Sequence, residues 1–424
     1  METRHNNSLP PAIILGGNAN AVSIARSLGR AGILVYAINV PEEAVRYSRF
    51  TRWISIPRRP GSRSESWANY LLGPESDHLR NAVLLAANDE ALELIAQHRP
   101  ALSAKYRLDI SNPAAQLCML DKLSTYRAAR EAGVPTPRFW VADTREDIER
   151  FEDELVFPLM LKPLSSHRFW QHFSGRKYIL VRRFEDLLAT FDAVSSAKIP
   201  IFLVEAIPGA DDKLCSYYTY IDEDGCHLFD FTKRVIRRYP VNMGLGSYHI
   251  TDHVPGVKEL ALKLFRQVGL RGVANVEFKL DSRDSRLKLI ECNARFTAVD
   301  CLLGSSGIDL PLFVYRRLVG LTQAPPSTYR IGVRLWDPVR DLFAYRQLNQ
   351  MRLLSFRGWV RSLLHRQTFA FFRWDDPFPA LFDSIRLVML WRKLESSGSA
   401  VATTSSEFGG APQSMQRDAI PLRD

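Results

Sequence analysis

Two carboxylates, one carboxamide and one arginine in the second half of the chain have the residue types and spacing of a magnesium and phosphate site. Glu277 lies in GVANVEFKLD, and the other residues follow in RLKLIECNAR after a polar turn. Alternation along a strand puts Glu291, Asn293 and Arg295 on one face, and hairpin pairing would bring Glu277 opposite that face. Oxygen ligands of this kind suit Mg²⁺ held together with nucleotide phosphates, and Arg295 would neutralise a phosphoryl group in transfer. A solvated sheet face with an ordinary Glu–Arg pair is the alternative interpretation.

Two lysines stand where a strand or a helix would present them to an anion. Lys162 ends the apolar run FPLMLKP, so its ammonium group either extends to solvent or meets an anion. Lys122 follows Asp121 at the start of a helix, where the helix dipole disfavours a cation unless an anion is near. The alternative for Lys122 is a solvated first-turn lysine. The polar stretch SSHRFWQHFSGRK after Lys162 is the candidate loop to close over a phosphate chain.

A carboxylate at a strand end is a candidate for nucleotide recognition. Glu205 ends the run IFLVEAI and is followed by the turn PGADD, residues 208–212. An ionised carboxylate only accepts hydrogen bonds, so Glu205 would accept from an adenine amino group or a ribose hydroxyl. The alternative is an acid in a linker.

Two further motifs are weaker. The turn GGNAN, residues 16–20, lies between a predicted strand and helix, where backbone N–H groups hold phosphates in other proteins. It is not GxGxxG, and Asn39 stands where a dinucleotide fold has an acid, so a plain turn or a substrate-side loop is favoured over NAD binding. His249 and His253 have the i, i+4 spacing of zinc ligands, but their turn-rich flanks favour a loop near the substrate pocket.

The elements that would hold these residues divide the chain into five parts. Strand, helix and strand alternate with short connections over residues 10–112, which predicts a parallel α/β domain. Two α+β lobes follow at 113–207 and 208–325, the second with the candidate metal site. A basic, aromatic extension at 326–395 precedes a tail at 396–424 that is poor in large apolar residues.

The order of these motifs resembles the ATP-grasp superfamily over about residues 10–320. The resemblance rests on DK before a helix that ends in GVPTP, then FPLMLKP, LVEAIPG, VEFKLD and LIECNAR. Within the superfamily the chain is similar to the carboxylate–amine ligases related to D-aspartate ligase and to predicted carboligases. FTKRVIRRYP and SSGIDLP also match that group. The resemblance implies a Rossmann-like pre-ATP-grasp domain, of α/β class, followed by a two-lobed α+β ATP-grasp domain.

The resemblance also implies roles for individual residues. The phosphates of ATP would contact Lys122 and Lys162; adenine would contact Glu205 and the backbone through Ile207; and the ribose would contact Asp211 or Asp212. The metal ligands would be Glu277, Glu291 and Asn293, for two Mg²⁺ ions that Mn²⁺ is expected to replace. The catalytic residues would be Arg295 and Lys162, and the substrate carboxylate would meet Arg234 and Arg237. The loop over the phosphates departs from the family pattern, because it carries His167, Trp170 and His172 in place of small residues.

The activity implied is that of an ATP-dependent ligase, which activates a small-molecule carboxylate as an acyl phosphate and joins it to an amine. Two alternatives remain open. One is an ATP-grasp phosphotransferase without ligation, and the other is a degenerate ATP-grasp protein that acts as a basic peripheral binding protein.

Composition limits the class of protein and its partners. Among the 424 residues there is no run of about 18 apolar residues, which excludes a multi-pass membrane protein. The polar N-terminus predicts no secretory signal, and five scattered cysteines without a CxxC predict reduced thiols in the cytoplasm. The net charge of +10 fits an anionic partner.

Much of the positive charge lies at the C-terminal side. Residues 330–395 hold 12 Arg and Lys against 6 Asp and Glu, interleaved with aromatic residues. Three interpretations compete for this segment: a packing extension or homodimer contact, a peripheral contact with an anionic membrane, and nucleic-acid binding. No nucleic-acid partner is expected, since no recognised binding motif is present.

Overall fold

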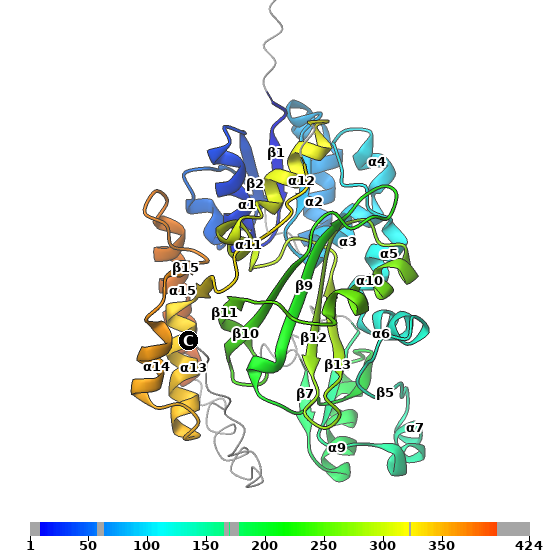
Figure 1. Ribbon diagram of the computed structural model, residues 1–424. Coiled ribbons are helices and arrows are strands. Elements are labelled where there is room, and N and C mark those ends of the chain that lie inside the picture. The colour runs from blue at the N-terminus through cyan, green and yellow to red at the C-terminus, as the bar shows by residue number, and fades with distance from the viewer. Residues whose placement is uncertain (1–8, 57–62, 165–168, 170–177, 322–323, 397–424) are drawn as a thin grey trace, which may run out of the picture.

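The computed structural model describes residues 9–56, 63–164, 169, 178–321 and 324–396, with the side chains of 390–396 excepted. Within these residues the chain forms three β-sheets (Figure 1). The predicted tail and the predicted phosphate-covering loop, with His167, Trp170 and His172, lie outside the described residues. Among the helices that are described, none is long and apolar enough to cross a membrane.

The first sheet is parallel and has helices on both faces. Its strands are β1 (Ala12–Leu15), β2 (Val35–Asn39), β3 (Arg52–Ser55) and β4 (Val83–Ala86), in the order β3-β2-β1-β4. Helix α1 (Ala19–Arg30) packs on the face that carries Ile14, while α2 (Arg63–Leu72) and α3 (Asp89–Gln97) pack on the face that carries Ile13. A short helix, α4 (Arg99–Ser103), follows. Strands β1, β2 and β4 are buried on both faces, which explains why their runs are largely apolar in the sequence.

The second sheet is antiparallel and forms the smaller lobe. Its strands are β5 (Phe139–Trp140), β6 (Leu159–Pro163), β7 (Ile179–Val181) and β8 (Ile201–Glu205), in the order β5-β8-β6-β7. Helices α7 (Arg145–Arg150) and α9 (Phe184–Ser196) bury Ile148 and Leu187 against it. Helices α5 (Pro113–Leu120) and α6 (Lys122–Glu131) precede this lobe, and the Asp121 carboxylate caps α6 by accepting from Ser124.

The third sheet has seven strands and carries the three predicted metal ligands. Its strands are β9 (Leu214–Ile221), β10 (Phe231–Tyr239), β11 (Leu245–Thr251), β12 (Gly272–Leu280), β13 (Leu287–Asn293), β14 (Arg334–Trp336) and β15 (Gln367–Phe369). Their order is β13-β12-β9-β10-β11-β14-β15. Helix α10 (Val257–Val268) covers one face together with α6, burying Leu264 and Phe265. The basic C-terminal segment thus contributes two strands to the sheet.

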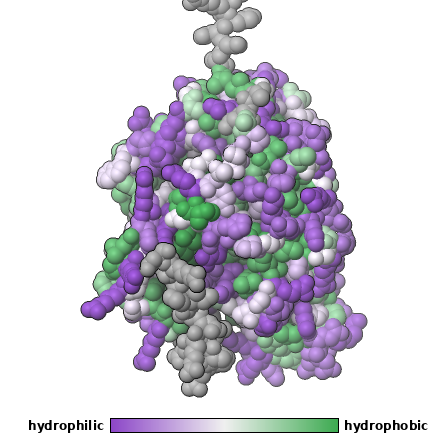
Figure 2. All heavy atoms as spheres, viewed as in Figure 1, coloured by the Kyte–Doolittle hydropathy of each residue, from purple (hydrophilic) through white to green (hydrophobic). Residues whose placement is uncertain are grey.

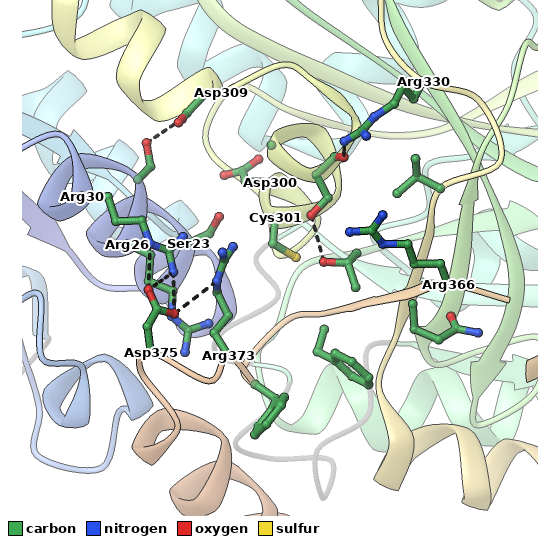
Figure 3. A pocket seen from close by; sticks show the side chains of 18 of the residues that line it. Ser23, Arg26, Arg30, Asp300, Cys301, Asp309, Arg330, Arg366, Arg373 and Asp375 are labelled. Carbon is green, nitrogen blue, oxygen red and sulfur yellow. Dashed lines mark hydrogen bonds and ion pairs between the residues drawn. The ribbon is translucent and has the colours of Figure 1, made fainter.

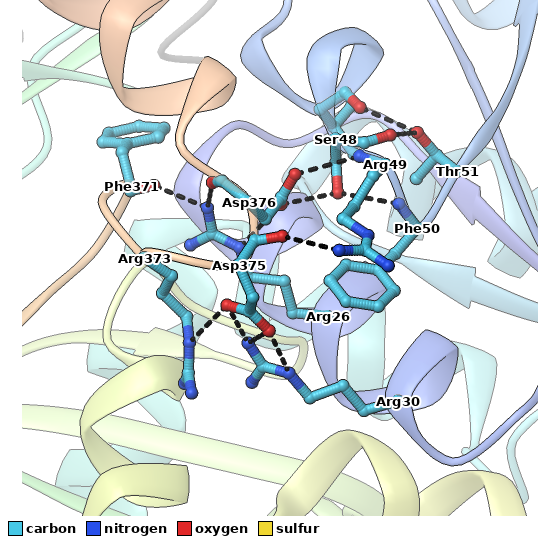
Figure 4. A network of polar contacts seen from close by, with 11 residues as sticks. Arg26, Arg30, Ser48, Arg49, Phe50, Thr51, Phe371, Arg373, Asp375 and Asp376 are labelled. Atoms are coloured by element: carbon cyan, nitrogen blue, oxygen red, sulfur yellow. Dashed lines mark hydrogen bonds and ion pairs between the residues drawn. The ribbon is translucent and has the colours of Figure 1, made fainter.

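The remaining helices return the chain to the first sheet. They are α11 (Asp300–Ser306), α12 (Leu310–Leu318), α13 (Pro338–Gln350), α14 (Phe356–Leu363) and α15 (Phe378–Ser396). Between α14 and α15, the buried Asp376 pairs with Arg26 of α1 at 2.8 Å and accepts from the Ser48 hydroxyl at 2.8 Å (Figure 4). Asp375 makes a two-pronged ion pair with Arg30 beside it. The C-terminal segment is therefore fixed to the first domain as well as to the large sheet.

Candidate functional site

Four polar residues form a row across neighbouring strands of the large sheet. The register aligns Lys233 of β10 with Ser216 of β9, and Ser216 with Glu277 of β12. Glu277 is in turn aligned with Glu291 of β13, so the predicted hairpin pairing is confirmed. The Ser216 hydroxyl donates to Glu277 at 3.4 Å, and the Lys233 nitrogen lies 4.0 Å from a Glu277 oxygen.

A β-bulge turns Glu291 toward its partner. Glu277 pairs with Glu291, but the next residue, Phe278, pairs with Leu289, so β13 holds one more residue than β12 here. Strict alternation would put Leu289 and Glu291 on the same face. Instead Leu289 is fully buried in the core with Cys292, and Glu291 is released from that face. Bulges beside functional sites commonly re-aim a side chain in this way.

A buried asparagine orients the amide that was predicted to bind metal. The Asn293 side-chain nitrogen donates to the Asn275 amide oxygen at 3.2 Å, and Asn275 donates onward to the Tyr217 carbonyl at 3.1 Å. Because its nitrogen faces Asn275, the Asn293 oxygen points the other way and can act as a ligand. Sequence reasoning missed Asn275, whose only signal was a single amide in an apolar strand.

The oxygen donors fit a magnesium ion that also binds phosphate. In the described ranges, no group of three His, Cys, Asp or Glu side chains is placed to hold a metal by itself. Two carboxylates and one amide leave coordination positions for phosphate oxygens and water, which is the usual way in which Mg²⁺ is bound. Glu277, Glu291 and Asn293 are therefore suited to a metal that arrives with a nucleotide.

Lys162 reaches this group from the smaller lobe. Its ammonium nitrogen lies 3.2 Å from the Tyr126 hydroxyl, which donates to the Ile290 carbonyl of β13 at 3.1 Å. Burial lowers the pKa of Lys162 to about 8, while the charge of Glu291 acts in the opposite direction. A lysine that is still mostly protonated at neutral pH and lies near Glu291 is well placed to receive a phosphate anion.

A small cavity brings further predicted residues together. It measures about 30 Å³, and Lys122, Glu291 and Asn293 line it together with Asp89 and Tyr126. This is the volume of about one water molecule, so a nucleotide would lie along the outer side of these groups. A much larger cavity, of about 1000 Å³, includes none of the predicted site residues, and its size does not make it the place of the chemistry.

Arg295 connects the large sheet to the first domain. Its Nε donates to the carboxylate of Asp89, the first residue of α3, and its Nη1 donates to the Phe296 carbonyl at 3.1 Å. The motif spacing gave no signal for Asp89, because the contact joins residues about 200 positions apart. The arginine is thus held in a defined direction while its side chain stays 15% exposed.

The glycine turn supports the same junction. Gly16 and Gly17 have φ values of +68° and +80°, and a Cβ on Gly17 would lie 2.6 Å from the Ala87 side chain. Glycine is therefore required for a turn packed against the end of β4. Asn20 donates to the Phe296 carbonyl at 3.3 Å, next to Arg295. These contacts agree with a tightly packed turn that joins strand and helix; the substrate-side loop stays a prediction.

The residues predicted to bind adenine lie beside the C-terminal end of β12, next to Lys279. Glu205 is 3% exposed, accepts from the Arg138 backbone N–H at 3.1 Å and pairs with Arg283. Lys279 lies two residues beyond Glu277 and donates to the Ile207 carbonyl at 2.9 Å. Burial lowers the pKa of Lys279 to about 8. Lys279, which the sequence did not indicate, thus ties the predicted adenine segment to the strand that carries Glu277.

The two candidate ribose acids have different surroundings. Asp211 is 7% exposed and pairs with Arg238, and it also accepts from the Asn242 backbone N–H at 3.2 Å. Asp212 is exposed. The two neighbours therefore differ in how readily a ligand could reach them.

The two arginines predicted to bind a substrate carboxylate are already in ion pairs. Arg237 is buried and grips Asp341 with two hydrogen bonds of 2.8 Å. Arg234 pairs with Asp252, and alternation along β10 puts it on the opposite face from Lys233. The structure brings Lys233, not these arginines, to Glu277, and it is 1% exposed. The substrate role of Arg234 and Arg237 stays a prediction that none of these contacts supports.

Comparisons with known proteins agree with this arrangement. A family model described as the ATP-binding domain of the carbamoyl-phosphate synthase L chain matches residues 250–316. D-Aspartate ligase of Enterococcus faecium (strain Aus0004) is 25% identical over 366 residues, which cover 81% of this chain and 86% of that protein.

Solved structures resemble the fold. Biotin carboxylase from Campylobacter jejuni superposes with a TM-score of 0.59 at 15% identity, covering 76% of this chain and 74% of its own. N5-carboxyaminoimidazole synthetase from Staphylococcus aureus superposes with a TM-score of 0.57 at 15% identity, covering 77% and 81%. At this identity the likeness concerns the fold.

Proposed function

We propose that this chain, an ATP-grasp protein homologous to D-aspartate ligase, is an ATP-dependent ligase that activates a carboxylate as an acyl phosphate and joins it to an amine, releasing ADP. The observation that carries the proposal is the row of Lys233, Ser216, Glu277 and Glu291, in which Glu291 lies near Lys162 of the smaller lobe. Acids and lysines gathered in this way match the charge of a triphosphate and its metal.

The chemistry explains why these residue types are needed. A carboxylate is a poor acyl donor because its leaving group would be oxide, whereas an acyl phosphate releases phosphate. Phosphoryl transfer is promoted mainly by positioning and by neutralising charge. When bound, Mg²⁺ would neutralise the phosphate oxygens as a Lewis acid. Lys162 would hold the phosphates, and Arg295, oriented by Asp89, would face the transferred group.

The remaining assignments are part of the same proposal. Two metal ions, Mg²⁺ or Mn²⁺, would be held by Glu277, Glu291 and Asn293. The nucleotide would be held by Lys122, Glu205 and the Ile207 backbone, with the ribose at Asp212, whose exposure supports it over Asp211. All five cysteines are free thiols, which supports a cytoplasmic location.

The test is ADP release in a matrix of acids and amines, drawn from amino acids and small dicarboxylates. A ligase releases ADP at its full rate only when both an acid and an amine are present. Release with a single acceptor would instead identify a phosphotransferase. If MgATP does not stabilise the protein against heat and the protein does not hydrolyse MgATP, the chain is a degenerate ATP-grasp protein. The ligase proposal would then fail.

Nucleotide binding should weaken as the pH rises through 8. The pKa of Lys162 is about 8 in the folded protein, below its ordinary value of 10.5, so its positive charge is present below pH 8 and lost above it. The dissociation constant for MgADP should then rise by up to about tenfold per pH unit above 8. Calorimetric titration between pH 6.5 and 9.5 measures this. Lys162→Arg stays charged and should give a shallower profile than the parent, because Lys279 still titrates near pH 8; a flat profile in the parent protein would contradict the role of Lys162.

We also propose that α14 rests on an anionic membrane surface. Residues 351–366 contain four arginines and no acid. Phe356 and Leu364 are 60% and 74% exposed along this helix, with Arg357 and Arg361 beside them. Trp359, whose ring lies 6.1 Å from that of Phe356, anchors the helix by donating a hydrogen bond to Asp341. An apolar strip flanked by arginines has the charge and shape that suit the lipid–water interface.

Co-sedimentation with vesicles tests this contact. The protein should bind vesicles that contain phosphatidylglycerol, lose binding in 0.5 M salt, and not bind neutral phosphatidylcholine vesicles. Phe356→Ser with Leu364→Ser should reduce binding at least fivefold, whereas Leu245→Ser, also 50% exposed but on β11, should not. If the double variant instead converts a dimer into a monomer and leaves vesicle binding unchanged, α14 is a homodimer contact.

A further inference from the structure

A second site is formed by the cavity of about 1000 Å³, whose lining includes neither Glu277 nor Glu291. Its walls come from α1, from α11 and from the C-terminal residues 365–375 (Figure 3). Most of the charged side chains that line it are cationic: Arg26, Arg30, Arg330, Arg366 and Arg373, with His365 beside them. None of the residues assigned to the ligase chemistry belongs to this lining.

The acidic residues of the lining do not balance the arginines. Arg26 is matched by Asp376, while Arg30 and Arg373 share Asp375, the latter at 3.6 Å. Arg366 has no ion pair or hydrogen bond within the described ranges of the chain. In Figure 3 the guanidinium groups of Arg366 and Arg373 approach the middle of the cavity from opposite sides. An anion between Arg366 and Arg373 would meet two positive charges, of which, among the residues that the structure describes, only that of Arg373 is paired with a carboxylate, Asp375.

One oxygen of a buried acid in the cavity wall has no hydrogen-bond partner among the described residues. Asp300 is 1% exposed, and its Oδ2 has no hydrogen-bond partner in the part of the chain that the structure describes. Its other oxygen accepts from the Thr297 backbone N–H at 3.3 Å. Burial raises the pKa of Asp300 to about 8, so at neutral pH the side chain is a neutral O–H donor. A buried donor without an acceptor indicates that a ligand or water supplies one.

The rest of the wall can hold the body of a small molecule. The hydroxyl groups of Ser305 and Thr368 lie 2.9 Å apart, and Arg330 is fixed by donating to the Ser305 carbonyl. Phe372 and Trp374 meet edge to face at 4.9 Å, and Trp374 is 89% exposed. Aromatic faces next to arginines suit a ligand that joins an anionic group to a flat or apolar part.

We propose that this cavity is a binding site for a small molecule that carries a phosphate group. The phosphate would lie between Arg366 and Arg373, with Arg330 at its edge and Asp300 donating to an oxygen. Guanidinium groups form two-pronged hydrogen bonds with phosphate, and three of them match its several oxygens better than those of one carboxylate. The inference is independent of the ligase proposal, because it rests on residues that play no part in it.

The test uses inorganic phosphate and pyrophosphate as probes, in calorimetry at constant ionic strength with MgADP present to fill the nucleotide site. Both probes should bind, pyrophosphate more tightly, and succinate should bind at least tenfold more weakly. Arg366→Gln should weaken phosphate binding at least tenfold. Arg346→Gln, which removes an exposed arginine of α13 outside the cavity, should change it less than twofold. Asp300→Asn retains an N–H donor and should bind as the parent does, whereas Asp300→Ala should weaken binding.

Three results would overturn the proposal. They are binding that MgADP abolishes, binding that Arg366→Gln leaves unchanged, and succinate binding as tight as that of phosphate. The first would place the phosphate in the nucleotide site, the second on another surface, and the third would make this a site for carboxylates. Arg366 has an exposed side chain, so the thermal midpoint of Arg366→Gln should match the parent and show that the variant is folded.

Discussion

Glu291→Gln is expected to lower the rate of MgATP-dependent ADP formation at least 100-fold. The carboxylate stands opposite Glu277 and close to Lys162, where its charge would bind the metal shared with the phosphates. Glutamine keeps the size and one oxygen of the side chain but removes the negative charge. Loss of one preorganised electrostatic group at a reacting centre commonly costs about 3 kcal/mol or more of transition-state stabilisation. A coupled assay of ADP release with saturating acid and amine measures the effect.

A matched variant separates this effect from a general loss of structure. Glu259→Gln changes an exposed glutamate on α10, outside the site, and should retain the full rate. The thermal midpoint of Glu291→Gln without nucleotide should stay near that of the parent, because the change relieves repulsion from Glu277. Normal ADP formation by Glu291→Gln would remove the metal role, and the ligase proposal would then lose its central residue.

Asp341→Ala is expected to lower the free energy of unfolding by about 3–5 kcal/mol, the usual cost of leaving one member of a buried ion pair without its partner. Asp341 is fully buried and accepts from Arg237 twice, from the Ser247 hydroxyl, and from the indole N–H groups of Trp336 and Trp359. The variant leaves the Arg237 charge and three other donors buried without an acceptor. Chemical denaturation followed by tryptophan fluorescence measures the loss.

Limited proteolysis locates the same effect. Residues 338–369 should be cut earlier in Asp341→Ala than in the parent, because α13 and α14 are anchored through this carboxylate. Asp153→Asn, an exposed change in the smaller lobe, should alter neither the denaturation curve nor the cutting pattern. Equal stability of Asp341→Ala and the parent would mean that the aromatic packing of Tyr345 on Trp359, not the buried charge, holds the segment.

The hairpin that carries Glu277 and Glu291 could be predicted from the sequence, because strand alternation and a short turn determine how its two strands pair. Two apolar strands with a short polar turn can pair in few ways, so Glu277 and Glu291 had to lie close together. The bulge that releases Glu291 from the face of Leu289 was not predictable, since alternation carries no signal for an added residue. Lys233 was missed for a similar reason. It stands beside Arg234 in one basic run, and the sequence does not show which of the two faces Glu277.

Contacts between residues that are far apart in the chain could not be predicted from the sequence. Asp89 begins α3 beside the first sheet, whereas Arg295 follows β13 of the large sheet, and nothing in either motif indicates the other. The strands β14 and β15 have three residues each, which is too short for the alternation of a strand to be recognised in the sequence. Strand β14 pairs with the edge of β11, and β15 pairs with β14. The basic composition of the C-terminal segment was evident, but its role in extending the sheet was not.

The late position of those two strands has a consequence for biosynthesis. Until residues 334–369 have left the ribosome, the growing chain carries a seven-residue edge strand, β11, with unsatisfied backbone groups along one side. Such an edge readily pairs with another nascent chain. Shortened chains that stop before Arg334 should therefore be prone to aggregation even though all the assigned nucleotide and metal residues are present.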